Sequence, residues 1–213
     1  MLFESNHKEK EAESMKKYMK DHFPFLGIKS PIRKEIEQGF FKETGTLKEP
    51  FDQELIIELW EKEEREYQYT ALTYIEKSLK KLQKEDLALM ERLVLEKSWW
   101  DTVDAIAAKP VGKIAEKFPE VIEETIDGWA QHDNMWLRRT AILFQLKYKE
   151  KTDEERLYRY IRSNSDSKEF FIQKAIGWAL REYSKTNPSS VKQFINENSL
   201  APLSVREGSK YVD

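Results

Sequence analysis

Residues 98–108 read Ser98-Trp99-Trp100-Asp101-Thr102-Val103-Asp104-Ala105-Ile106-Ala107-Ala108, and this stretch decides both the fold class and the candidate site. A serine before an apolar run is typical of a helix N-cap, so Ser98 is expected to open a helix that enters a core. Trp100 and Asp104 are then four residues apart, which places an indole and a carboxylate on one helical face. Tryptophan near a helix start usually fills a core, and aspartate in a first turn usually serves the helix dipole. Asp104 lies too far into the helix for that role, so a carboxylate within this aromatic cluster indicates a function.

An alanine followed by an aliphatic residue recurs along the chain at a nearly constant interval. The counterparts of Ala105-Ile106 are Ala71-Leu72, Ala141-Ile142 and Ala175-Ile176, and successive alanines are 34, 36 and 34 residues apart. A helical hairpin that repeats at this period is the signature of an α-solenoid. A tetratricopeptide array has a similar period, but its glycine and proline positions do not occur in successive repeats. The sequence therefore predicts HEAT-like repeats with a concave binding groove.

The expected repeats are pairs of helices, each predicted from apolar residues at intervals of three and four. The pairs are 51–63 with 64–82, 85–96 with 98–117, 119–131 with 134–150, 153–163 with 167–185, and 188–197 with 203–211. Two further helices are expected before them, over 13–22 and 31–41. The phenylalanine before Pro24 ends the first, because a residue before proline is pushed out of the α region.

Composition agrees with an all-α chain that forms a single domain over residues 1–213. The chain has seven glycines, seven prolines and no cysteine, while Lys, Glu, Leu and Ala abound. The lack of cysteine excludes disulfides, iron–sulfur clusters and thiolate zinc sites. No glycine-rich phosphate loop is found, so no nucleotide cofactor is expected. No apolar run approaches transmembrane length and the first residues are charged, which predicts a cytoplasmic protein with no membrane partner.

Charge is distributed unevenly. The net charge of the chain is −3, yet residues 1–137 carry −8, residues 138–192 carry +6 and residues 193–213 carry −1. A basic segment of this kind could neutralise phosphates although the whole protein is acidic.

In the repeat register Asp104 aligns with Thr70, Thr140 and Lys174, which predicts that these polar residues face one groove. Trp178 follows Lys174 by four residues and extends the same face. Positive charge is added on neighbouring turns by Arg138, Arg139, Lys147, Lys149 and Arg181. For a duplex ligand, cations would hold backbone phosphates and indoles would pack against sugar or base. The arginines could equally be solvated helix surface, and plain packing is expected for Trp60, Trp99, Trp129 and Trp136.

Three stretches together resemble the AlkD family of bacterial DNA alkylation repair glycosylases, and the similarity runs from Tyr18 to Ser204. They are residues 98–104, residues 134–149 (Asn-Met-Trp-Leu-Arg-Arg-Thr-Ala-Ile-Leu-Phe-Gln-Leu-Lys-Tyr-Lys) and residues 167–178 (Ser-Lys-Glu-Phe-Phe-Ile-Gln-Lys-Ala-Ile-Gly-Trp). The resemblance implies excision of cationic N3- and N7-alkylated purines from double-stranded DNA, by a monomer that needs no metal or cofactor.

By motif position the resemblance also implies the site residues. Asp104 is similar to the family's catalytic aspartate, and Trp100 and Trp178 to the two tryptophans beside the damaged nucleotide. Arg139 is similar to an arginine that holds the DNA backbone, Lys147 to a lysine that contacts phosphate, and Tyr18 to an aromatic residue that borders the site. The segment before Glu13 and the segment after Tyr211 look shorter than in the family, which is expected to affect DNA wrapping at the ends only.

Three functions remain open on sequence alone: a DNA N-glycosylase, a non-catalytic binder of damaged or branched DNA, and a protein-interaction α-solenoid. The acidic overall balance favours the third, and the polarised charge together with Trp100 and Asp104 favours the first. The three histidines are scattered and match no ligand pattern, so no metal site is predicted.

Overall fold

The structure is a computed structural model that describes residues 3–212. Every regular element in this range is helical, which confirms the all-α prediction. Contacts divide the chain into two compact units, Met1–Leu82 and Gln83–Asp213. That residues 1–213 form a single domain stays a prediction. Within residues 3–212 no helix is long and apolar enough to cross a membrane.

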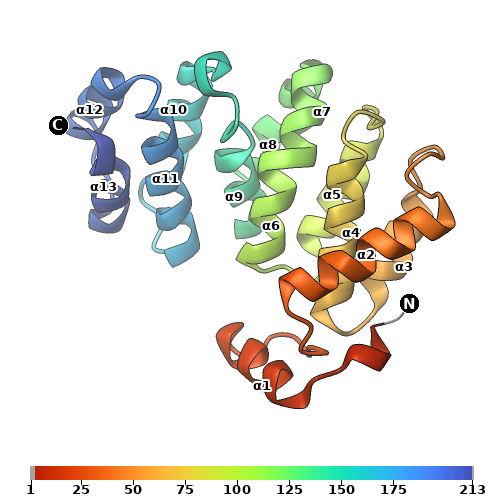
Figure 1. Ribbon diagram of the computed structural model, residues 1–213. Helices are drawn as coiled ribbons and strands as arrows, with labels where there is room; N and C mark the ends of the chain where they lie inside the picture. The colour runs from red at the N-terminus through yellow and green to blue at the C-terminus, as the bar shows by residue number, and fades with distance from the viewer. Residues whose placement is uncertain (1–2, 213) are drawn as a thin grey trace. The chain divides into compact units, whose positions relative to one another are not determined.

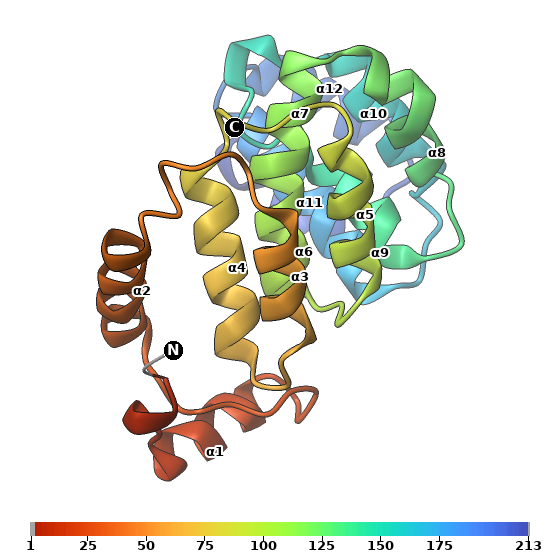
Figure 2. The same ribbon diagram turned by 90° about the vertical axis from the view of Figure 1, so that its right-hand side faces the viewer.

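The first unit contains four α-helices. They are α1 (Glu9–Tyr18), α2 (Ser30–Thr44), α3 (Gln53–Glu61) and α4 (Arg65–Lys77), preceded by a 3-10 turn at Glu4–Asn6. Helix α1 starts four residues before the predicted position and ends earlier, because Lys20 and Asp21 adopt positive φ angles of 57° and 60°. Helices α3 and α4 pack side by side (Figures 1 and 2).

A buried carboxylate fixes the connector between α1 and α2. Glu66 on α4 accepts hydrogen bonds from the backbone N–H groups of Leu26, Gly27 and Ile28 at 2.9 to 3.1 Å. Gly27 has φ of 78°, and a β-carbon there would lie 2.3 Å from the carbonyl oxygen of Lys8. Only glycine fits this position, since both the backbone angle and the close approach exclude a side chain.

The second unit contains the repeats that carry the candidate site. Its helices are α5 (Asp86–Leu95), α6 (Trp100–Ile106), α7 (Gly112–Lys117), α8 (Asp127–Trp129), α9 (Met135–Leu143), α10 (Glu154–Ser163), α11 (Phe170–Tyr183), α12 (Pro188–Glu197) and α13 (Pro202–Gly208). Helix α9 packs against both α6 and α11, and α13 packs against α11, so the second helices of successive pairs lie in sequence order (Figure 1). This arrangement confirms the predicted helical repeat.

The predicted helix 98–117 is one column made of α6, a π-helical segment at Ala107–Val111, and α7 (Figures 1 and 2). Pro110 lies inside the column and has no N–H to donate. A proline ring also collides with the carbonyl four residues earlier, and widening to π geometry accommodates it.

Two local predictions were wrong. Ser98 is not the N-cap of α6: the N-cap is Trp99, and the Ser98 hydroxyl donates to the carbonyl of Val94 at 2.6 Å, on the preceding helix. The helix predicted over 134–150 ends at Leu143. It ends there because the Gln145 side chain pairs with the backbone N–H and carbonyl of Asp153, which holds the chain in a turn toward α10.

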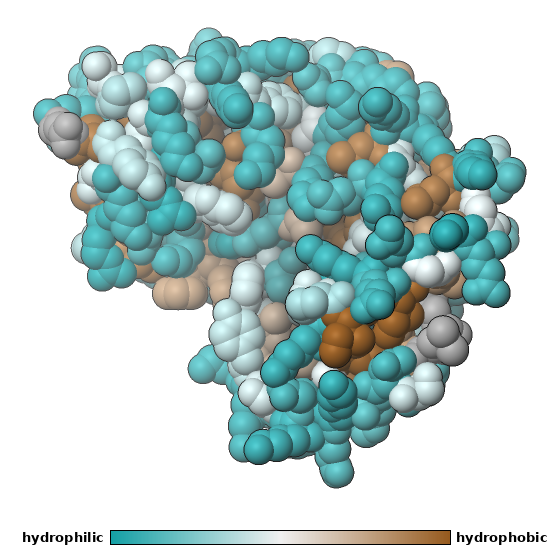
Figure 3. All heavy atoms as spheres, in the orientation of Figure 1, coloured by the Kyte–Doolittle hydropathy of each residue, from teal (hydrophilic) through white to brown (hydrophobic). Residues whose placement is uncertain are grey.

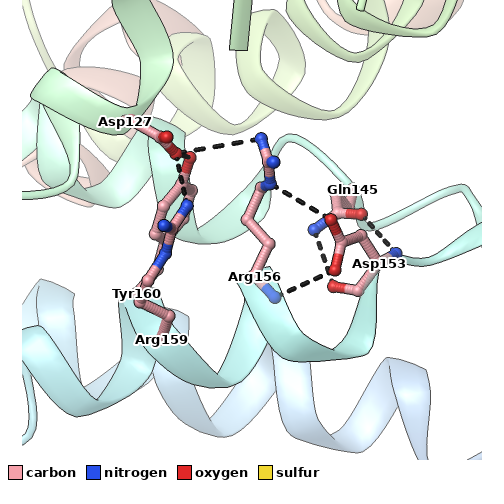
Figure 4. Close-up of polar contacts among 6 residues, drawn as sticks. All are labelled: Asp127, Gln145, Asp153, Arg156, Arg159 and Tyr160. Atoms are coloured by element: carbon pink, nitrogen blue, oxygen red, sulfur yellow. Dashed lines mark hydrogen bonds and ion pairs between the residues drawn. The ribbon is translucent and has the colours of Figure 1, made fainter. Parts of the chain in front are cut away.

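A charged cluster attaches α10 to the preceding repeat (Figure 4). The Asp127 carboxylate accepts hydrogen bonds from Arg159, at 2.8 Å, and from the Tyr160 hydroxyl, and Arg156 lies 3.8 Å away. Asp153 caps α10 by accepting the backbone N–H of Arg156. These polar contacts add to the packing of α10, whose Leu157 and Ile161 side chains are buried in the apolar core.

Apolar side chains of both the first and the second helices form the core of this unit, among them Met90 and Ile161 of the first helices. Ile106, Leu137, Leu143, Ile172 and Leu180 are fully buried. Hydrophilic side chains cover most of the face seen in Figure 3, with small hydrophobic areas between them.

Candidate functional site

Asp104 and Arg139 form a bidentate ion pair between α6 and α9. The Arg139 Nε donates to Asp104 Oδ1 at 2.7 Å, and Arg139 Nη2 donates to Asp104 Oδ2 at 2.8 Å. The side chain of Asp104 keeps 13% of its surface exposed, against 5% for Arg139. The carboxylate is therefore the more accessible member of the pair, with the guanidinium beneath it.

Arg139 links three consecutive second helices. Its third nitrogen, Nη1, donates to the backbone carbonyl of Phe171 on α11, and its guanidinium lies 5.9 Å from the centre of the Phe171 ring. A planar guanidinium can serve two acceptors at fixed angles, which an ammonium cannot. The position of the Asp104 carboxylate is thus tied to both α9 and α11.

Burial and charge act in opposite directions on Asp104. Burial raises the pKa of its carboxyl above the ordinary value of 3.8, and the negative charge of Asp101 adds to that, while Arg139 lowers it. Burial disfavours the charged form and the arginine favours it, and burial is the larger effect.

Phe171, which lies against the Arg139 guanidinium, packs in turn against two tryptophans. Trp99, Trp136 and Phe171 have ring centroids 5.0 to 5.7 Å apart. Trp136 is buried, as are Trp60 and Trp129. The packing role predicted for these tryptophans is confirmed.

Trp100 and Trp178, the two tryptophans expected beside the damaged nucleotide, are half-buried. Trp100 is the first residue of α6 and Trp178 lies in the middle of α11, on the two helices that flank α9. Both lie in the same compact unit as Asp104.

The predicted row of groove-facing polar residues is wrong in two places. Thr140 is fully buried, and its hydroxyl donates to the carbonyl of Trp136 at 2.8 Å. Thr70 is also fully buried and donates to Glu37 at 3.0 Å. A threonine can satisfy its hydroxyl on the preceding helical turn, so it is tolerated on a packed face where a charged residue is not.

The residues expected to bind DNA lie in different surroundings. Lys147 is exposed on the turn after α9, and Arg181 lies on α11, where it pairs with Glu207 at 3.2 Å. Arg139 is only 4% exposed, which leaves it little surface for a phosphate. Tyr18 is 68% exposed and belongs to the other compact unit. The contacts of these residues with DNA stay predictions.

Sequence reasoning missed Glu207 and Lys210, which join Lys174 and Arg181 in one charged cluster. A signal was available. The ion pairs Asp104–Arg139 and Lys174–Glu207 join residues 35 and 33 positions apart, close to the repeat period. Opposite charges separated by one repeat therefore indicate contacts between neighbouring second helices.

Within residues 3–212 no group of three His, Asp or Glu side chains is arranged to hold a metal ion. The candidate site contains the Asp104 carboxylate, the Arg139 guanidinium and nearby aromatic rings.

Comparison with known proteins places the chain in a family. Residues 2–212 match the family described as DNA alkylation repair enzyme. A solved structure described as a predicted DNA alkylation repair enzyme from Enterococcus faecalis is 36% identical, with a TM-score of 0.89 and 96% of each chain covered.

Two structures from Streptococcus mutans share the fold at lower identity. AlkD2 is 20% identical, with a TM-score of 0.63 over 84% of this chain and 90% of that one. The protein smu.31 is 18% identical, with a TM-score of 0.61 over 85% and 98%. No curated protein matches significantly. The match over residues 2–212 shows that the chain belongs to the DNA alkylation repair enzyme family.

Proposed function

We propose that the protein is a DNA glycosylase that hydrolyses the N-glycosidic bond of cationic N3- and N7-alkylated purines in duplex DNA. The observation that carries this proposal is the Asp104 carboxylate, which is held by both oxygens on a buried arginine and is still partly exposed. Family membership supports a role in repair of alkylated DNA.

The chemistry requires little from the protein beyond this carboxylate. An alkylated purine with a fixed positive charge leaves without protonation, taking the electron pair of the C1′–N bond and becoming neutral. The sugar then has oxocarbenium character, and water adds to C1′ with loss of a proton to solvent. A preorganised carboxylate stabilises the positive sugar, and indole faces favour the same cation.

Arg139 acts in this proposal as a positioning residue. Its guanidinium fixes the orientation of the carboxylate and opposes the effect of burial on its pKa. Trp100 and Trp178 are proposed to line the damaged nucleotide, with Lys147, Arg181 and Tyr18 contacting DNA.

The test is base release from a duplex that carries one N7-methylguanine. Asp104→Asn should reduce the single-turnover rate by about 10² to 10³, the usual cost of removing one electrostatic stabiliser of a transition state. DNA affinity should be retained or rise slightly, because the amide keeps the size of the carboxylate and removes one negative charge.

Asp101→Asn is the matched control, since Asp101 lies three residues earlier in the first turn of the same helix. It should retain base release at neutral pH. Equal rates for Asp104→Asn and wild type would contradict the proposed role of Asp104.

A second candidate is a non-catalytic binder of damaged or branched DNA, with Asp104 serving only to tie α6 to α9. The bidentate contact with Arg139 favours this alternative, because both carboxylate oxygens are already engaged. Salt-dependent binding of duplex DNA by the wild type, with no base release above the uncatalysed level, would support it.

A further inference from the structure

Three cations converge on one carboxylate where α11 meets α13. Glu207 Oε1 lies 3.1 Å from Lys174 Nζ, and Glu207 Oε2 lies 3.2 Å from Arg181 and 2.7 Å from Lys210 Nζ. We call these four residues the Glu207 cluster. It carries a net charge of +2, as three cations meet one anion.

The carboxylate lies beneath the cations. The side chain of Glu207 is 11% exposed, while those of Lys174, Arg181 and Lys210 are 38%, 28% and 47% exposed. Hydrogen bonds from Lys210 and Lys174 hold the pKa of Glu207 at about 2, so the carboxylate stays ionised near neutral pH. An anion that approaches from solvent therefore meets the cations first.

Close packing of α11 and α13 places Glu207 among these cations. A β-carbon at Gly177 would lie 2.6 Å from the Glu207 Cβ and 3.0 Å from the Ser204 carbonyl. The Ser204 hydroxyl donates to the carbonyl of Gln173 at 2.9 Å. The glycine lets α13 approach α11 so closely that Glu207 emerges between Lys174 and Arg181.

The cluster shares a helix face with a proposed site residue. Lys174, Trp178 and Arg181 are related as i, i+4 and i+7 on α11, which puts them on one side of the helix. Two ammonium groups and a guanidinium together offer many more N–H donors than the roughly four lone-pair sites of a carboxylate can accept. Donors therefore remain for a second anion.

We infer that Lys174, Arg181 and Lys210 together bind one backbone phosphate of DNA, and that Glu207 is a positioning residue that holds them in place. The inference rests on the proposed function in that it takes duplex DNA as the ligand. It adds Lys174 and Lys210 to the DNA-binding surface and gives an acidic residue a favourable role there.

Glu207→Gln separates this inference from a simple charge effect. The substitution makes the protein more positive, so charge alone would tighten DNA binding. If Glu207 positions the cations, binding of an undamaged duplex should instead weaken severalfold. The matched control is Glu124→Gln, which removes the same charge from a carboxylate 2.8 Å from Lys84. This control should bind DNA as tightly as wild type or slightly more tightly.

The lysines are tested by salt dependence. Loss of one phosphate contact lowers the steepness of log affinity against log salt concentration by about 0.9. Between 50 and 200 mM salt, the affinity of the variant should therefore fall by a factor roughly threefold smaller than that of the wild type. The Lys174→Gln/Lys210→Gln double variant should show this loss. Lys84→Gln should keep the slope of the wild type. Lys210→Arg should keep the DNA affinity of the wild type, because the positive charge is retained.

Thermal unfolding of each variant checks that the fold is kept. If Glu207→Gln unfolds, the lysine variants decide the question. Glu207→Gln binding as tightly as Glu124→Gln, or a slope for the double lysine variant equal to that of Lys84→Gln, would overturn the inference. Base release by the wild type is scored separately: its absence would contradict the glycosylase, while the binding changes would still report on the Glu207 cluster.

Discussion

At the residue scale, the environment of Asp104 is set by a contact with one guanidinium. Asp104 is largely buried, and a carboxylate in that position without Arg139 would lose most of its hydration with no compensating charge. Removal of one member of such a pair is far more costly than removal of both, because the remaining charge is left buried and alone.

Arg139→Gln should therefore destabilise the protein by about 3 to 5 kcal/mol. The Asp104→Asn/Arg139→Gln double variant should recover part of that loss. Urea unfolding of the single and double variants gives the coupling energy. Arg92→Gln, which breaks an exposed pair between Arg92 on α5 and Glu96 directly after this helix, is the control and should cost at most about 0.5 kcal/mol. Arg139→Gln and Arg92→Gln with equal stability would show that the buried pair contributes nothing.

The pH dependence of base release should also reflect the environment of Asp104. The raised pKa of this carboxyl means that it takes up a proton at a higher pH than an ordinary aspartate, so the rate should fall on acidification while the pH is still above 3.8. The negative charge of Asp101 contributes to the raised pKa, and Asp101→Asn should move the acid limb to lower pH. Rates are measured in single turnover with the uncatalysed loss subtracted. If the fall in rate on acidification occurs at the same pH in Asp101→Asn as in the wild type, this fall would be assigned to the titration of a group other than Asp104.

At the element scale, glycines decide how closely the second helices approach. Gly177 on α11 is covered by Glu207 and Ser204 of α13, whereas a β-carbon added to Gly128 on α8 would meet nothing within 4 Å. Replacing glycine by alanine should therefore have opposite effects at these two positions. At Gly177 the added methyl group overpacks the contact between two helices, which costs stability, while at Gly128 it meets no other atom and reduces the backbone freedom lost on folding.

Gly177→Ala should destabilise the protein by about 1 to 3 kcal/mol, because α13 must move away from α11. Gly128→Ala should be neutral or stabilising by up to about 1 kcal/mol, since alanine loses less backbone freedom on folding. Equilibrium unfolding in urea compares the two. A stable Gly177→Ala protein would mean that the contact between these helices adjusts without cost.

At the scale of the whole molecule, charge is segregated along the chain. The net charge is −3, while residues 138–192, which run from within α9 to within α12 and contain α10 and α11, carry +6. Residues 1–137 carry −8 and would repel DNA. Exposed charges further apart than about 8 Å are screened at physiological salt, so this repulsion should weaken DNA binding less than the net charge suggests.

Duplex DNA should therefore bind with a marked salt dependence despite the acidic composition. If at least two phosphates are neutralised, affinity should fall about tenfold or more between 50 and 200 mM salt. Fluorescence anisotropy with a labelled undamaged duplex measures this directly. An affinity independent of salt would argue for the protein-interaction alternative.

The sequence by itself determined the helical class, the repeat period and most helix positions. These properties follow from local rules: apolar spacing selects the helix, proline limits its start or end, and alanine at the same place in each repeat allows close packing. Asp104 also stood out as a candidate, because it lies too far into its helix to serve the helix dipole. Trp100 and Trp178 were candidates because each lies four residues from a polar residue of the repeat register and matches a tryptophan of the family.

Only the tertiary structure decided which side chains meet. Arg139 was expected to face DNA, yet it lies beneath Asp104 and reaches the carbonyl of Phe171. Thr140 is buried and bonds to the preceding helical turn. Glu207 forms ion pairs with two cations of α11 and with one cation in the segment after α13. Helical periodicity fixes the face on which a residue lies, but the partner across that face comes from another repeat, and its distance depends on how closely the two helices pack.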